Sequence, residues 1–291
     1  MMNQNRILYE DDHILVCHKP AGIATQTARI GQADMVSEME NYLARSLTQG
    51  SRQNETKTKP AHKRGNVIKQ PQIYVVHRLD QPVEGILVFA KQQAAAAALS
   101  AQAAGDEMEK EYLALVCDLR GKGPMQGSGQ TAERMQAGWR ERSGILTDYL
   151  LKDGKTNTSR IVPLEVKGAK EARLSYEILR EEWPEMLLSA KEADGVSGKG
   201  RAEGELQCAV VKIRLYTGRH HQIRVQMTNA GMPLLGDRKY APQEAIALSE
   251  RLGIRDVALC AYRLSFLHPQ TKVRMQFERK PEGAAFQGII S

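Results

Sequence analysis

The chain has few of the residues that build metal sites or disulfide frameworks. Its four cysteines, Cys17, Cys117, Cys208 and Cys260, are far apart and form no C-x-x-C pair. Three of them lie in apolar, strand-like runs, which is typical of reduced core thiols in a cytosolic protein. The seven histidines show no spacing of the kind that metal ligands have. We therefore expect no metal site.

Long hydrophobic runs are also missing. The first residues, MMNQNRILYEDD, lack the apolar core of a secretory signal, and no stretch is long enough to span a membrane. Nothing indicates a coiled coil or a large exposed apolar face. We therefore expect a cytoplasmic monomer that does not bind membranes.

Aromatic residues make up only 5% of the chain, which argues against extensive stacking on single-stranded bases. The net charge of +7 nevertheless suits a polyanionic partner, since neutralisation of phosphates dominates affinity for nucleic acids. A basic protein without such a partner remains an alternative.

The order of elements predicts an α+β protein with a mixed, largely antiparallel sheet and flanking helices. Helices are expected from Met35 to Leu47, where apolar residues share one side, and from Gln92 to Ala104, which is rich in alanine. Three polar or glycine-rich segments are expected to be loops or insertions: 50–70, 121–138 and 191–204. At 291 residues the chain is long enough for one large domain or two.

The segment VHRLDQPVEGILVFAK, residues 76–91, combines a carboxylate with a buried strand. The apolar run from Ile86 to Ala90 predicts a strand covered on both faces, and the preceding residues predict a loop that presents Asp80. Loops that a rigid strand positions commonly carry catalytic residues. The neighbouring Arg78 is expected to pair with Asp80 and to lower its pKa. The same pair also fits a solvated ion pair at the end of a strand.

The segment YTGRHHQIRVQMTNAGMPLLGDRKY, residues 216–240, follows a strand-like alternation. Thr217 as N-cap and Gly231 as C-cap favour a helix between them. Four potential cations at its start would form an anion site: Arg219, His220, His221 and Arg224. A basic, solvated helix is the alternative.

Taken together, these motifs resemble the RluA family of RNA pseudouridine synthases. The resemblance rests on HRLD before a glycine-bounded strand and on TGR-x-HQIRV followed by GMPLLGD-x-x-Y. Weaker similarity covers residues 7–27 with the KPAG turn, KEYLALV at residues 110–116 and LCAYRLSFLHPQTK at residues 259–272. Agreement at several separated motifs, in the family's order, is more specific than one short match.

The resemblance implies a pseudouridine synthase fold with a central active-site cleft. It implies a single catalytic domain over residues 1–291, without an N-terminal S4-type RNA-binding module. The implied substrate is ribosomal or transfer RNA, and the implied reaction needs neither a metal nor an organic cofactor.

The family's functional residues map onto this chain one by one. Asp80 matches the aspartate that attacks the target uridine, and Arg224 matches its basic partner. Tyr112 matches the tyrosine that packs on the target base, although by itself it also fits an ordinary core tyrosine. Arg78 matches an arginine that replaces the flipped nucleotide in the RNA stack. Arg219 and His221 are expected to contact RNA.

The residue types suit this chemistry independently of the resemblance. A carboxylate can assist cleavage of a glycosidic bond by acting at the sugar, and a stacked uridine must be extruded before it can react. One departure is Glu84, where the family usually has a small hydroxyl residue; we expect its carboxylate either to raise the pKa of Asp80 or to face solvent. A catalytically silent RNA-binding protein of the same fold, and a nucleosidase or glycoside hydrolase with a second carboxylate, remain alternatives.

Overall fold

A computed structural model describes residues 6–29, 31–53, 71–120, 142–182 and 206–287. The predicted loops 121–138 and 191–204 lie outside these residues, as does most of 50–70. None of the described helices is long and apolar enough to cross a membrane. The described residues also contain no group of three or more histidine, cysteine, aspartate or glutamate side chains placed to hold a metal ion.

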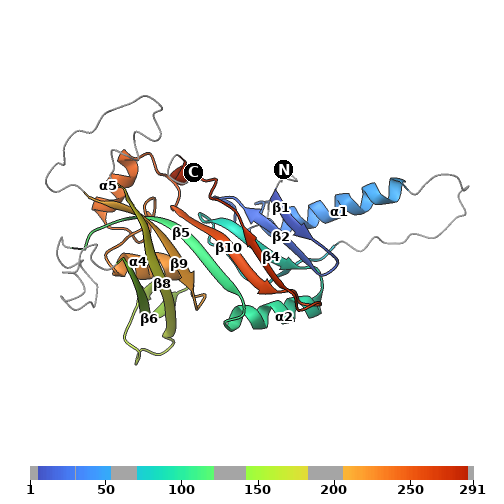
Figure 1. Ribbon diagram of the computed structural model, residues 1–291, viewed down its shortest axis with the longest axis horizontal. Coiled ribbons are helices and arrows are strands. Elements are labelled where there is room, and N and C mark those ends of the chain that lie inside the picture. The colour runs from blue at the N-terminus through green and yellow to red at the C-terminus, as the bar shows by residue number, and fades with distance from the viewer. Residues whose placement is uncertain (1–5, 30, 54–70, 121–141, 183–205, 288–291) are drawn as a thin grey trace, which may run out of the picture.

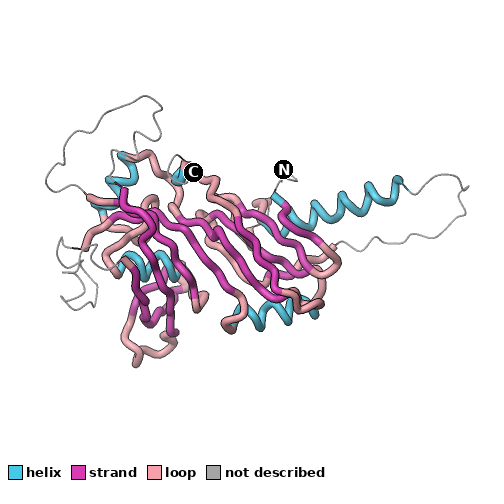
Figure 2. The backbone as a smooth tube through the Cα atoms, viewed as in Figure 1, coloured by secondary structure: helices cyan, strands magenta, loops and turns pink. Residues whose placement is uncertain are grey.

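The described strands form one mixed sheet, so the predicted fold class is confirmed (Figures 1 and 2). Its order is β1-β2-β4-β10-β5-β9-β8-β6-β7, with β3 paired to β4 and β11 to β10. Only the β4–β10 pair among these strands is parallel. The strand bounds are β1 Ile7–Glu10, β2 Ile14–Lys19, β3 Tyr74–Val75, β4 Glu84–Ala90, β5 Glu109–Cys117, β6 Ser143–Asp153, β7 Thr158–Ile161, β8 Lys170–Glu182, β9 Cys208–Leu215, β10 Leu259–Leu267 and β11 Arg274–Glu278.

Helices cover both faces of the sheet because the strands alternate buried side chains on either side. On one face, apolar residues of α1 (Met35–Gln53) and α4 (Gln222–Asn229) belong to the cluster that contains Tyr112. On the other face, α2 (Gln93–Ala104) and α5 (Gln243–Arg251) pack over two further clusters. A short 3-10 helix, η4 (Ala284–Phe286), ends the described chain.

The first helix is longer than predicted. It runs to Gln53, whereas the apolar pattern ended at Leu47, so residues 50–53 of the predicted loop are helical. The pattern missed this end because the last turn contains no apolar residue that could mark a buried face. In Figure 1 this helix extends beyond the edge of the sheet.

The strand β4 begins at Glu84, two residues before the predicted start at Ile86. Its first two residues pair in parallel with Cys260 and Ala261 of β10. Gly85 adopts φ +137°, and a Cβ there would lie 2.5 Å from the backbone N and O of Ala261, so the position requires glycine. This close approach depends on a strand far away in sequence, which a local pattern cannot register.

The alternative in which Glu84 faces solvent is wrong. Its carboxylate is 5% exposed and accepts hydrogen bonds from the backbone N–H groups of Glu282 (3.1 Å) and Gly283 (2.9 Å). It therefore does not face solvent; it fixes the C-terminal segment to the start of β4. Burial raises the pKa of Glu84, while the two backbone donors oppose that rise.

Candidate active site

A cavity of about 1030 Å³ opens on the face of the sheet that carries α4. It brings together segments that are far apart in sequence: the loop before β4, strand β5, the start of α4 and the β6–β7 turn. All six residues predicted for the site line this cavity: Arg78, Asp80, Tyr112, Arg219, His221 and Arg224.

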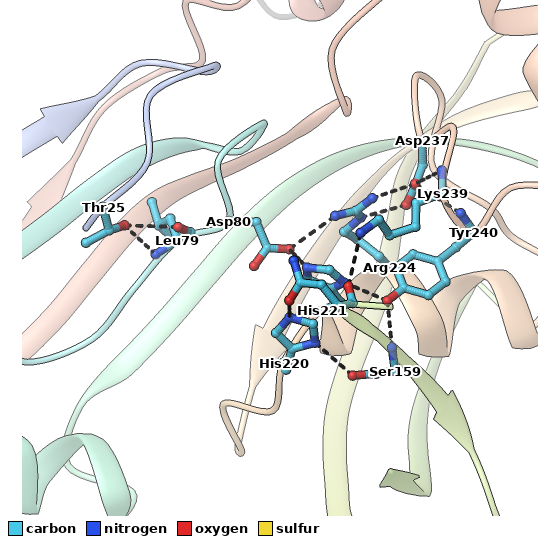
Figure 3. Close-up of polar contacts among 11 residues, drawn as sticks. Thr25, Leu79, Asp80, Ser159, His220, His221, Arg224, Asp237, Lys239 and Tyr240 are labelled. Atoms are coloured by element: carbon cyan, nitrogen blue, oxygen red, sulfur yellow. Dashed lines mark hydrogen bonds and ion pairs between the residues drawn. The ribbon is translucent and has the colours of Figure 1, made fainter. Parts of the chain in front are cut away.

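The loop that carries Asp80 is fixed from both sides by the segment after β2. Thr25 Oγ1 donates to the carbonyl of Leu79 at 2.9 Å and accepts from its N–H at 3.1 Å (Figure 3). On the other side of Asp80, the carbonyl of Gln81 accepts from the Gly22 N–H at 2.9 Å and from Lys19 Nζ at 3.0 Å. Both neighbours of Asp80 are therefore held, so the aspartate is presented by a rigid loop.

Lys19 is completely buried although it carries an ammonium group. Its Nζ also donates to the carbonyls of Pro20 (2.9 Å) and Ile23 (2.6 Å), which closes the KPAG turn. Burial lowers the pKa of Lys19 to about 7, although the carboxylates of Asp80 and Glu84 oppose this. Lys19 therefore connects the KPAG turn to the loop that carries Asp80, and it places a titratable amine near the carboxylates of Asp80 and Glu84.

Asp80 does not pair with Arg78. Its Oδ2 lies 3.4 Å from Arg224 Nη1 and 3.7 Å from His221 Nε2, and its side chain is 27% exposed. Removal from water raises the pKa of Asp80, and Arg224 opposes this only in part. The prediction that a neighbouring arginine lowers the pKa was wrong, because burial outweighs the charge of the partner.

Arg224 is fixed by a second carboxylate. Its Nε and Nη2 donate to the two oxygens of Asp237 at 2.8 and 2.7 Å, and the Asp237 side chain is fully buried. The guanidinium carbon also lies 5.1 Å from the centre of the Tyr240 ring. This fork presents the remaining nitrogen of Arg224 toward Asp80.

The helix that carries Arg224 starts later than predicted. It begins at Gln222 after His221, and its C-cap is Ala230 rather than Gly231, which follows at φ +76°. Thr217 is not the N-cap: its hydroxyl donates to the Gln222 side-chain oxygen at 2.8 Å and accepts from the Arg173 N–H at 2.8 Å. The residues between β9 and α4 therefore form a turn tied to β8.

The two histidines before α4 are neutral rather than cationic, which corrects the predicted four-cation site. Burial lowers the pKa of His220 to about 4 and that of His221 to about 3, and the cations nearby add to the shift. Their rings stack with centroids 3.7 Å apart. A local sequence pattern could not show this, because the two rings bond to Ser159 on β7 and to Tyr240 after α4.

The remaining predicted residues occupy different parts of the cavity. Tyr112 on β5 is 6% exposed, and burial raises the pKa of its hydroxyl well above the ordinary value. Arg78 and Arg219 are exposed at the opening. Arg219 Nε donates to the Glu171 carbonyl at 2.7 Å, which anchors its side chain at the edge of β8.

Known proteins that are similar to this chain identify its family. The sequence model of a family described as RNA pseudouridylate synthase matches residues 13–229. The chain belongs to that family. This confirms the resemblance to the RluA family, whose named members are among its relatives.

Curated relatives of this family are similar over most of the chain. A ribosomal large subunit pseudouridine synthase C from Haemophilus influenzae is 26% identical over 94% of this chain, which spans 64% of that protein. The dual-specificity RNA pseudouridine synthase RluA from Vibrio vulnificus is 28% identical over 91% of this chain and 78% of its own length. The solved structure of human RNA pseudouridylate synthase domain containing 4 has a TM-score of 0.59 at 19% identity, over 98% of this chain and 91% of that one, which supports the fold.

Within the family's TGR and GD-x-x-Y stretches, the sequence interpretation assigned roles to only some of the residues that form the site. Asp237 and Tyr240 contact Arg224 and His221, yet neither received a role. The spacing of GD-x-x-Y was the available signal. Thr25 gave no signal, because its partner Leu79 is 54 residues away.

Proposed function

We propose that this protein is an RNA pseudouridine synthase, an isomerase in which Asp80 is the nucleophile. The observation that carries the proposal is the position of Asp80, beside Arg224 in a cavity that Tyr112 also lines, within a chain of this family. The relatives named above act on RNA according to their names. The chain spans 64% of the length of the Haemophilus influenzae relative and 78% of the Vibrio vulnificus relative.

The proposed reaction leaves the composition of the uridine unchanged, because the proton lost from C5 is balanced by one gained at N1. An oxygen of the Asp80 carboxylate attacks C1′ of the ribose, and the electron pair of the C1′–N1 bond leaves with the base. The detached base turns so that C5 faces C1′. C5 then bonds to C1′ and Asp80 is released, after which C5 loses its proton and N1 gains one. This isomerisation needs no metal, no redox cofactor and no water.

The neighbours of Asp80 suit these steps. The charge of Arg224 favours the ionised nucleophile and the electron-rich detached base. The ring of Tyr112 offers an apolar wall against which the base can pack. The exposed guanidinium of Arg78, two residues from Asp80, can occupy the gap that an extruded uridine leaves in the RNA stack.

The charge around the cavity supports an RNA partner. Cationic side chains line it on several sides: Arg78, Lys110, Lys152, Arg219, Arg224 and Lys239. Lys239 also lines a second opening of about 510 Å³ with Arg238 and Arg255, so the basic surface continues past the Asp237 loop. We propose a structured RNA substrate, ribosomal or transfer RNA, bound through its phosphates by a cytoplasmic monomer.

A glycoside hydrolase is a poorer fit to this site. Among the described residues that line the cavity, Asp80 is the only carboxylate. Glu84 is held by backbone donors and Asp237 by Arg224, so neither is free to activate water. Hydrolysis by paired carboxylates would require such a group.

The test uses RNA labelled with tritium at C5 of uridine. We expect the wild-type protein to release tritium from unmodified cellular RNA, and Asp80→Asn to release none while its thermal unfolding stays close to wild type. An inactive wild type, together with an Asp80→Asn variant that binds the RNA and releases no tritium, would favour the silent RNA-binding protein. Free uracil in place of tritium release would favour the hydrolase.

A further inference from the structure

The GD-x-x-Y stretch reaches the site through a hydrogen bond between Tyr240 and His221. We propose that Tyr240 holds His221 in the tautomer whose Nε2–H donates to Oδ2 of Asp80, so that Oδ1 is the attacking oxygen. Both side chains act as positioning residues. The inference rests on the proposed function, because Asp80 must be the nucleophile.

The direction of the Tyr240–His221 hydrogen bond follows from the second hydrogen bond that the Tyr240 hydroxyl makes. The backbone N–H of Ser159 donates to Tyr240 Oη at 2.8 Å, and Oη lies 2.6 Å from His221 Nδ1 (Figure 3). Among the described residues, Nδ1 is the one acceptor within hydrogen-bond distance of the phenolic hydrogen. Tyr240 therefore donates to Nδ1.

A neutral imidazole with an accepting Nδ1 carries its hydrogen on Nε2. His221 is neutral because burial, Arg224 and His220 keep its pKa near 3. Nε2 lies 3.7 Å from Asp80 Oδ2, a separation from which catalytic hydrogen bonds tighten in a substrate complex. The ring is thus a fixed donor aimed at the carboxylate.

The His221 ring has little freedom to turn away. Its backbone adopts φ +55°, which is uncommon for a residue with a side chain and sets the ring direction. His220 stacks on it and is itself held by Ser159 Oγ at 2.9 Å and by Asn157 Oδ1 at 3.1 Å. The Tyr240 backbone is fixed in turn, since its N–H donates to Asp237 Oδ1 at 3.2 Å.

Both donors approach the same oxygen of the nucleophile. Arg224 Nη1 and His221 Nε2 face Oδ2, and no described side chain bonds to Oδ1. A carboxylate oxygen without hydrogen bonds is the better nucleophile, because no hydrogen bond to its lone pairs has to break before attack. The arrangement therefore selects Oδ1, and His221 keeps its hydrogen throughout.

Three variants separate the parts of this arrangement. His221→Asn suits a positive φ and keeps a partner for Tyr240, but it lacks a donor at the position of Nε2. His221→Gln places an amide N–H near that position and is the matched control. Tyr240→Phe keeps the ring over Arg224 and removes only the hydroxyl.

We expect His221→Asn to lower kcat by about 10- to 100-fold with little change in KM, since one hydrogen bond to a charged group is lost. His221→Gln should retain most of the rate, and Tyr240→Phe should lose part of it. Tyr240→Phe added to His221→Asn should cost nothing further, because Tyr240 acts through His221. Equal losses in the Asn and Gln variants, or additive losses in the double variant, would overturn the proposal.

The pH profile supplies a readout that a purely structural role would not move. Without the donor, the ionised Asp80 loses stabilisation, so the acid limb of kcat/KM should shift to higher pH in His221→Asn and Tyr240→Phe. The other groups that face Asp80 stay in place: Arg224, Lys19, Asp237 and Tyr112. An unmoved acid limb would contradict the role of His221.

The tautomer can also be measured without any turnover. The 15N shifts of His221 in the wild-type protein should report hydrogen on Nε2, and Tyr240→Phe should bring the other tautomer into exchange. Hydrogen on Nδ1 in the wild type would refute the proposal even if tritium release succeeded. Failure of the proposed activity would instead appear as an inactive wild type.

Discussion

Thr25 and Leu79 exchange two hydrogen bonds across 54 positions of the chain, and so they fix the residue directly before Asp80. Thr25 is 2% exposed, so its loss would leave both backbone groups of Leu79 without partners in a buried place. We expect Thr25→Val to cost about 1–3 kcal/mol of unfolding free energy and to lower kcat.

Thr25→Ser is the matched control, because it keeps the hydroxyl and removes one methyl group. Chemical denaturation and tritium release on the two variants give the comparison. Equal activity in the Val and Ser variants would mean that the loop is held by other contacts.

The buried fork between Arg224 and Asp237 predicts a strong effect of Asp237→Asn. The substitution leaves the Arg224 charge without its closest partner, which costs about 3–5 kcal/mol for a buried pair. Because Asp237 raises the pKa of Asp80, its neutralisation should also move the acid limb of kcat/KM to lower pH. A denaturation curve like that of wild type would show that the fork contributes little.

His18 predicts acid sensitivity of the folded state. Its side chain is 1% exposed, both ring nitrogens lack hydrogen-bond partners, and burial lowers its pKa from 6.5 to about 4. Below pH 6.5 the unfolded state therefore binds a proton at His18 that the folded state does not bind. The free energy of unfolding consequently falls as the pH drops toward 4.

Between pH 7 and pH 5 this group should cost about 2 kcal/mol. His18→Phe keeps a buried ring without the titrating group, so its unfolding free energy should fall less over that interval. Parallel curves for the two proteins would assign the acid sensitivity to other histidines, such as His77, whose pKa burial lowers to about 3.

Lys239 lines both openings and is expected to neutralise one RNA phosphate. Lys239→Ala should weaken RNA binding and reduce the slope of log K against log salt by about 0.7–0.9. Lys280→Ala, an exposed lysine that lines neither opening, is the charge-matched control. Filter binding at several salt concentrations gives both slopes, and identical slopes would remove Lys239 from the RNA path.

The sequence predicted which residues line the site better than it predicted their pKa values and charges. Asp80, Tyr112 and Arg224 were found because each lies in a distinctive local motif, and they do line one cavity. The pKa of Asp80 and the charge of His221 were missed, because both depend on burial by strands and loops distant in the chain. For the same reason the sheet class was predictable, whereas the parallel β4–β10 pair was not.

That parallel pair also sets the order in which the active site can form. Strand β4, which follows Asp80, lies between β2 near the start of the chain and β10 at Leu259–Leu267. During synthesis the Glu84–Gly85 end of the strand therefore lacks its β10 partner until residues almost 180 positions later have left the ribosome. Contacts of such sequence separation slow folding. The loop that carries Asp80 consequently reaches its final support only after β10 has been synthesised.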